Sequence, residues 1–138
     1  MDILKLLIGT RDSLTPFDYD HYPAAFENFS AQLFSLPEIR EESLSAEEIL
    51  ESFTAYYAAL PSRQQKKEID LDRQVLALFF TPAAVMNEGP LSTLSEELCE
   101  LWNKKYPKYR YYPTTYEKIM AGFDANLLGL PLRKSKKR

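Results

Sequence analysis

Apolar residues recur every three or four positions along most of this chain, and this spacing constrains the fold more than any other feature. The clearest stripe consists of Ile49, Leu50, Phe53, Tyr56, Tyr57 and Leu60. Such spacing places the apolar side chains on one face of an α-helix, whereas the two-residue alternation of a half-buried strand is scarce here. The sequence therefore predicts an all-α protein, a compact bundle of about five or six helices.

Capping residues and prolines set the expected limits of these helices. Ser45 and Glu48 form a capping box, and Pro61 closes the helix that follows. A second helix should run from near His21 to just before Pro37, because proline disfavours helical backbone in the residue that precedes it.

Later in the chain the same signals predict two further helices. One helix should start after the Gly89-Pro90 break and end before Pro107. Another should be capped by Thr114 or Thr115 and should bury Tyr116, Ile119, Met120 and Phe123.

Three segments need separate interpretation. Residues 70–80 are apolar around most of the helical circumference, which predicts the central helix. Thr81 and Pro82 are expected to interrupt it, with Thr81 as N-cap of a short helical turn over residues 83–88. The apolar run 3–8 fits either a short helix or a buried strand, and residues 109–112 form the other plausible strand.

The domain organisation follows from length and from the last residues. The 138 residues, of which 45% are apolar, are enough for one packed core, and we expect residues 1–126 to form a single helical domain. Residues 127–138 finish with five bases in six positions and are expected to form a flexible basic tail, disordered in solution.

The rare residue types exclude several classes of site. The four glycines are far apart, so no glycine-rich phosphate loop is present. A single cysteine excludes an internal disulfide and a cysteine-based zinc site. Asp12, Asp18 and Asp20 lack the spacing and the closing glutamate of an EF-hand. We therefore expect no metal and no cofactor.

No arrangement of residues indicates catalysis. His21 and Cys99 are the only members of their types; Cys99 is expected to be a half-buried structural thiol, and His21 to make local hydrogen bonds. The acidic helical faces, formed by Glu47, Glu48, Glu51, Glu96, Glu97 and Glu100, are typical of solvated surfaces. We expect that the protein is not an enzyme.

The sequence also bears on location. No apolar run reaches the roughly 18–20 residues that a membrane span needs. The N-terminal segment lacks the basic start and the cleavage site of a signal peptide. We expect a cytoplasmic protein that does not enter a membrane.

Charge is divided unevenly along the chain. Residues 1–100 carry 18 acids and 7 bases, whereas residues 101–138 carry 2 acids and 10 bases. The formal net charge of −3 conceals this division. Such asymmetry indicates binding surfaces, or attraction between the two parts within one molecule or across a homodimer.

The most unusual stretch spans residues 102–113, with four bases, no acid and five aromatic residues. The expected contact residues are Trp102, Lys105, Tyr109, Arg110, Tyr111 and Tyr112. Tryptophan, tyrosine and arginine are enriched where protein interfaces gain most affinity, so a protein partner is the favoured interpretation. Single-stranded nucleic acid is the alternative, because rings stack on bases and cations meet phosphates. A third interpretation is that the tyrosines simply pack against the last helix.

Overall fold

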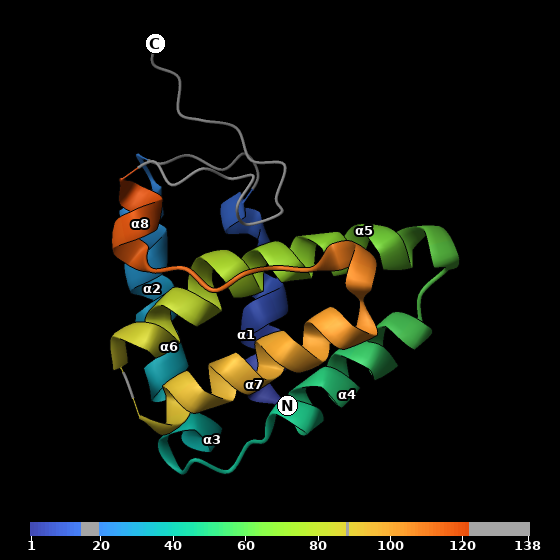
Figure 1. Ribbon diagram of the computed structural model, residues 1–138, viewed down its shortest axis with the longest axis horizontal. Helices are drawn as coiled ribbons and strands as arrows, with labels where there is room; N and C mark the ends of the chain where they lie inside the picture. The colour runs from blue at the N-terminus through green and yellow to red at the C-terminus, as the bar shows by residue number, and fades with distance from the viewer. Residues whose placement is uncertain (15–19, 88, 122–138) are drawn as a thin grey trace.

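The computed structural model describes residues 1–14, 20–87 and 89–121, and all its regular elements within these residues are helical (Figure 1). The α-helices are α1 (Asp2–Gly9), α2 (Tyr22–Ser35), α3 (Pro37–Arg40), α4 (Ala46–Ala58), α5 (Ser62–Val75), α6 (Thr81–Asn87), α7 (Pro90–Lys105) and α8 (Tyr116–Met120). Two 3₁₀ turns, η1 (Thr10–Leu14) and η3 (Pro107–Tyr109), and a π-helical turn, η2 (Leu76–Phe80), complete the set. The predicted all-α class is confirmed.

The N-terminal apolar run is a helix, which decides between the two interpretations that the sequence allowed. Ile3 and Leu7 are buried, and α1 contacts α2, α4 and α5. Its first amides have no capping side chain from Met1. Instead, Oε1 of Glu38 in α3 accepts hydrogen bonds from the backbone N–H groups of Asp2 (2.9 Å) and Ile3 (3.1 Å). This contact satisfies two amides that a helix start leaves free.

The predicted caps are present at α4 and α8. At α4 the Ser45 N–H donates to Glu48 Oε1 (2.9 Å), and the Glu48 N–H donates to Ser45 Oγ (3.2 Å). At α8 it is Thr115 that caps the helix, through a hydrogen bond from the Lys118 N–H to Oγ1 (3.2 Å). The helix over α7 begins after Gly89, whose φ of 74° favours glycine, and ends before the next proline, as expected.

The predicted interruption at Thr81 and Pro82 is wrong. Helical backbone continues without a break from Ser62 through η2 to Asn87, and Thr81 is itself helical (φ −61°, ψ −48°). A π-helical turn precedes the proline, in which the Thr81 N–H bonds to the carbonyl of Leu76, five residues earlier. This widened turn accommodates a residue that would otherwise break a helix.

Tyr22 compensates for the amide that Pro82 lacks. In a regular helix the N–H of residue 82 would bond to the carbonyl of Leu78, and proline has no N–H. The Tyr22 hydroxyl, from α2, donates to that carbonyl. The Tyr22 ring also packs against Phe79 of η2 and Tyr116 of α8, so one side chain joins three elements.

The central rod made by α5, η2 and α6 is buried on all sides over its middle. Val75, Leu76, Ala77, Leu78, Phe79 and Phe80 each have no exposed surface. With this rod counted once, the described residues form five helices of seven or more residues, in agreement with the expected number. α7 packs on α4 and on α6 (Figure 1).

The possible strand over residues 109–112 is absent from the described chain. Residues 109–112 were a possible strand, but in the described chain they form the end of η3 and an extended connection without strand pairing. The last described helix ends at Met120. Asp18, Phe123 and the expected flexible tail 127–138 lie outside the described residues.

Candidate functional site

The stretch that the sequence analysis singled out is held to α7 by its backbone. The Asn103 side chain pairs with Tyr111: its Nδ2 donates to the Tyr111 carbonyl (2.9 Å), and its Oδ1 accepts from the Tyr111 N–H (3.0 Å). The indole N–H of Trp102 donates to the carbonyl of Tyr109 (2.8 Å). These bonds fix the path of the chain after α7. They satisfy backbone N–H and C=O groups that have no partner from regular secondary structure in this connection.

Trp102 and Tyr111 are core residues, which corrects the expectation that they contact a partner. Both have no exposed surface. The Trp102 ring packs edge-on against Phe53 of α4 (5.4 Å between centroids) and lies 6.3 Å from the Tyr111 ring. Both large rings therefore stabilise the bundle by removing apolar surface from water, as the packing interpretation of this stretch requires.

The other four expected contact residues reach the surface. Lys105, Arg110 and Tyr112 are exposed, and Tyr109 is half-buried. The Arg110 guanidinium lies over the Tyr112 ring, 5.8 Å from its centroid. Stacking of this kind orders a long side chain while its charge stays in water.

Arg73 of α5 fixes the backbone beside these residues. Its guanidinium donates to the Arg110 carbonyl (2.9 Å), pairs with Asp70 (2.8 Å) and lies 5.9 Å from the centre of the Tyr109 ring. The side chains of Arg110 and Tyr112 thus project from a backbone that is anchored to both α5 and α7.

A group of bases surrounds this exposed strip, and we call it the basic patch. It consists of Arg63, Lys66 and Lys67 of α5, Lys104 and Lys105 of α7, and Lys108 of η3. All six are exposed, and none forms an ion pair with a carboxylate in the described part of the chain.

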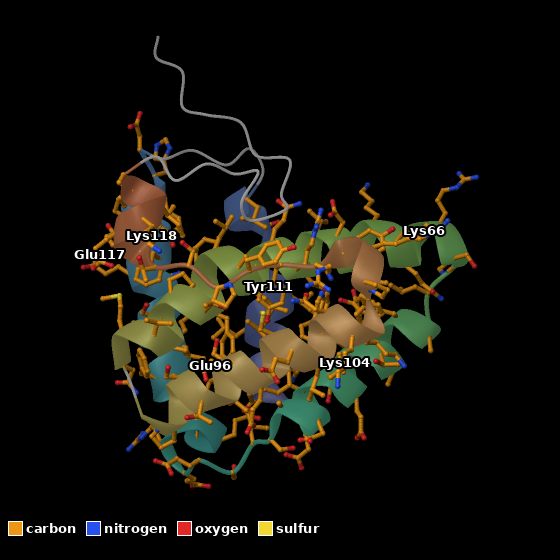
Figure 2. All side chains as sticks on the ribbon, viewed as in Figure 1. Lys66, Glu96, Lys104, Tyr111, Glu117 and Lys118 are labelled. Atoms are coloured by element: carbon orange, nitrogen blue, oxygen red, sulfur yellow. The ribbon has the colours of Figure 1, made fainter. Side chains whose placement is uncertain are left out.

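The fold brings these six bases to one end of the molecule. η3 contacts both α5 and α7, and the start of α5 lies at the same end as the finish of α7, as Lys66 and Lys104 indicate (Figure 2). The α5 bases were missed as site residues. The signal was present in the sequence, since residues 63–68 carry three bases and no apolar residue, but only the fold shows that the start of α5 and the end of α7 lie at the same end of the molecule, with η3 in contact with both helices.

A second charged cluster is partly buried, with Asp72 at its centre, and has a structural role. Nε and one terminal nitrogen of Arg11 each donate to a different oxygen of Asp72 (both 2.8 Å). The Tyr57 hydroxyl donates to Asp72 Oδ2 (2.5 Å), and Arg11 also pairs with Glu68. The cluster joins η1, α4 and α5, and every carboxylate in it is hydrogen-bonded.

Burial and hydrogen bonding act in opposite directions on these two acids. Burial raises the pKa of Asp72 above its ordinary value, although Arg11 and Tyr57 favour its charged form. Burial also acts to raise the pKa of Glu68, but hydrogen bonds from Tyr56, Gln64 and Arg11 outweigh it, and the pKa of Glu68 lies below its ordinary value.

The residues considered for other chemistry are also placed by the structure. Cys99 is buried, its Sγ lies 3.5 Å from the Tyr111 carbonyl, and burial raises the pKa of its thiol. His21 is exposed at the N-cap of α2. Across residues 1–14, 20–87 and 89–121, no group of three or more His, Cys, Asp or Glu residues is arranged to hold a metal ion.

Over the same described ranges, each helix is too short or too polar to cross a bilayer. Comparison with known proteins adds no relative: no family model, no curated protein and no solved structure matches this chain. The basic patch and its exposed strip are therefore interpreted from their own chemistry.

Proposed function

We propose that this protein has no enzymatic activity and acts by binding an acidic surface of a protein partner. The contact would be made by the basic patch together with Lys105, Tyr109, Arg110 and Tyr112. The observation that carries the proposal is the gathering of six exposed, unpaired bases from α5, α7 and η3 at one end of the molecule.

The lysines and the stacked pair Arg110 and Tyr112 would contribute to binding in different ways. The lysines are long and solvated, and such charges chiefly raise the rate of encounter with an acidic partner. Arg110 and Tyr112 are stacked and more rigid, so they lose less freedom on binding and are suited to the dry centre of an interface.

The test is an affinity capture from native lysate with the full-length protein as bait, with and without nuclease. A partner protein should be retained after nuclease treatment, and Lys66→Glu/Lys105→Glu should release it. The matched control is Lys5→Glu/Arg40→Glu, which makes the same change of charge in α1 and α3, away from the basic patch. Equal retention by both double variants would contradict the proposal.

Single-stranded nucleic acid is the second candidate, favoured by the tyrosine rings that lie beside cations on this surface. A gel shift with an oligothymidine probe tests it directly. Binding to phosphates should weaken with salt, with a log–log slope of about −0.7 per contact. Absence of any shift at low salt removes this candidate.

A homodimer and a cytoplasmic location both remain predictions. Light scattering of the purified protein measures the first, and fractionation of the source cells measures the second. A dimer that dissociates in Lys66→Glu/Lys105→Glu, but not in the control variant, would identify a second copy as the acidic partner.

A further inference from the structure

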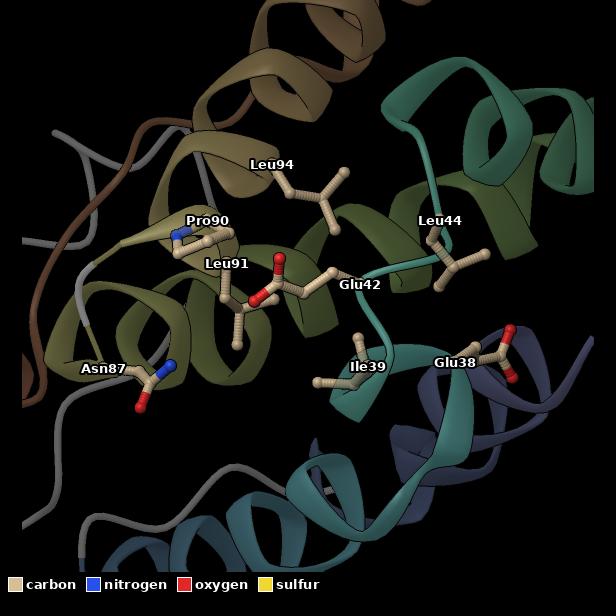
Figure 3. A pocket seen from close by; sticks show the side chains of 8 residues that line it. All are labelled: Glu38, Ile39, Glu42, Leu44, Asn87, Pro90, Leu91 and Leu94. Carbon is tan, nitrogen blue, oxygen red and sulfur yellow. The ribbon is translucent and has the colours of Figure 1, made fainter.

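A pocket of about 200 Å³ lies between α3, the turn that follows it and the start of α7. Its apolar walls are Ile39, Leu44, Leu91 and Leu94, as Figure 3 shows, and Asn87 lies at one end. A cavity of about 150 Å³ is enough to hold a benzene ring, so this pocket has room for an aliphatic side chain.

The rim of this pocket carries negative charge. Glu38 and Glu42 line it, and none of the described lining residues is a base. Glu38 is already engaged, because it caps α1. Glu42 is exposed and its side chain has no hydrogen bond or ion pair among the described residues, so its carboxylate is free to meet a cation.

Glu42 also has an unusual backbone. It occupies the left-handed region (φ 53°), the only described residue other than glycine to do so. The Glu42 N–H bonds to the Ile39 carbonyl and the Ser43 N–H to the Glu38 carbonyl, which is the pattern that normally ends a helix with glycine. Glycine would suit this backbone better, so Glu42 holds its carboxylate beside the pocket at some conformational cost.

We propose that this pocket binds the C-terminal segment of the same chain, residues 127–138. That segment has four leucines, Leu127, Leu128, Leu130 and Leu132, followed by five bases in its last six positions. Its leucines match the apolar walls and its bases match the free carboxylate of Glu42 together with the neighbouring, exposed Glu41. The aliphatic groups of the segment are followed by its cationic groups, which is the order that suits a partly open apolar pocket with acids beside it.

The length of the segment permits this contact. Seventeen residues follow Ala121, and an extended chain spans roughly 3.3 Å per residue, or about 56 Å in total. A compact chain of 138 residues has a radius of gyration of about 14 Å. The leucines lie 6 to 11 residues after Ala121, which allows about 20–36 Å, so the later leucines can span a distance comparable to the diameter of the molecule.

Two other hollows are less suited to this occupant. One, between α1 and α2, includes both Asp2 and Lys5, so its lining has no net negative charge to attract the bases of the segment. The other, between α2, α6 and α8, is lined by Pro23, Phe26, Met86 and Tyr116 with Glu27 as its one acid. This second hollow is the appropriate competitor for the experiment.

The test places a nitroxide label on the full-length variant Ser135→Cys. Cys99 is buried, with only 6% of its surface exposed, and should remain unlabelled. In methyl NMR spectra the signals of Ile39, Leu44, Leu91 and Leu94 should lose most of their intensity, whereas the methyl of Met86 should not. Glu42→Lys should restore the lost intensity, and the matched variant Glu27→Lys should leave it lost.

Four outcomes with the labelled chain alone, and a fifth in a mixture of chains, would overturn the proposal. The first four are unaffected pocket methyls, stronger loss at Met86, restoration by Glu27→Lys alone, or an unchanged pattern when Leu128 and Leu130 are both replaced by serine. A mixture of spin-labelled molecules with isotope-labelled, spin-free molecules tells whether the contact lies within one chain. Intensity loss in that mixture would assign the pocket to a second copy and would also refute the proposal.

Discussion

The hydroxyl of Tyr22 donates a hydrogen bond to the carbonyl of Leu78, which is the carbonyl that Pro82 cannot serve. Tyr22 lies in α2 and Leu78 in η2, and both are buried. A side chain 56 residues away in the sequence thus allows a proline to lie within the central rod.

Tyr22→Phe should destabilise the protein by about 1 kcal/mol, because it removes a buried hydrogen bond to the Leu78 carbonyl. Urea unfolding measures this change in the free energy of unfolding. Tyr116→Phe is the control, since no hydrogen bond is recorded for the Tyr116 hydroxyl in the described residues, and its effect should stay within about 0.5 kcal/mol.

The compensation itself can be tested with Pro82→Ala. This substitution returns an N–H four residues after Leu78, and the added donor can serve the same carbonyl. Tyr22→Phe should therefore cost less in the Pro82→Ala background than in the natural sequence. Equal costs in a double-mutant cycle would show that Tyr22 and Pro82 act independently.

Glu68 should contribute a pH-dependent part of the stability. Its pKa in the folded protein lies below the ordinary value of 4.5, so its contribution is present above that pH and is lost as the pH falls through the folded pKa. Glu68→Gln should consequently lose less stability than the natural protein on acidification below pH 4.5. Thermal unfolding at a series of pH values measures the difference, and parallel curves would contradict it.

Glu42→Gly should raise the free energy of unfolding by about 1 kcal/mol, because glycine adopts the left-handed backbone without steric cost. Glu42→Gln removes the charge alone and should leave stability nearly unchanged. Differential scanning calorimetry compares the two. A lower melting temperature for Glu42→Gly would show that the carboxylate stabilises the fold itself.

Asn103→Ala should cost about 2 kcal/mol, since it removes both hydrogen bonds between the Asn103 side chain and the backbone of Tyr111. Hydrogen exchange should accelerate at the Tyr111 amide before it does so in the core of α4. Asn103→Asp keeps the acceptor and should give an intermediate effect. Unchanged exchange would mean that the connection after α7 is held by other contacts.

Tyr111→Phe should leave stability unchanged or raise it by up to about 1 kcal/mol, because the Tyr111 hydroxyl is buried without a hydrogen-bond partner in the described structure. The same variant should retain any partner that the basic patch binds. Loss of binding with an intact fold would indicate that the Tyr111 hydroxyl contributes to partner binding after all.

The sequence predicted the helices well because their signals are local. Spacing of apolar residues, the capping box at Ser45 and the proline before the last segment each act within a few residues of the chain. The predicted helix interruption at Pro82 was wrong because the relevant contact is distant in the sequence. Nothing near that proline reveals that Tyr22 supplies a donor from another helix.

Only part of the candidate site could be predicted, because local composition does not show which residues the fold buries. Composition identified the exposed Lys105, Arg110 and Tyr112, but it could not separate them from Trp102 and Tyr111, which have similar chemistry and lie in the core. Burial depends on which face of a segment meets the bundle. The contribution of Lys66 to the same surface depends on helix packing, which brings distant residues together.

α7 connects two surfaces of different character. Leu91 and Leu94 near its start line the acid-rimmed pocket, and Lys104 and Lys105 form part of the basic patch at its end. A helix of 16 residues is about 24 Å long and stiff, and it acts as a fixed spacer. The basic patch therefore stays at a constant distance from the pocket where we propose that the C-terminal segment binds, so a partner at one end of α7 would not compete with that segment at the other end.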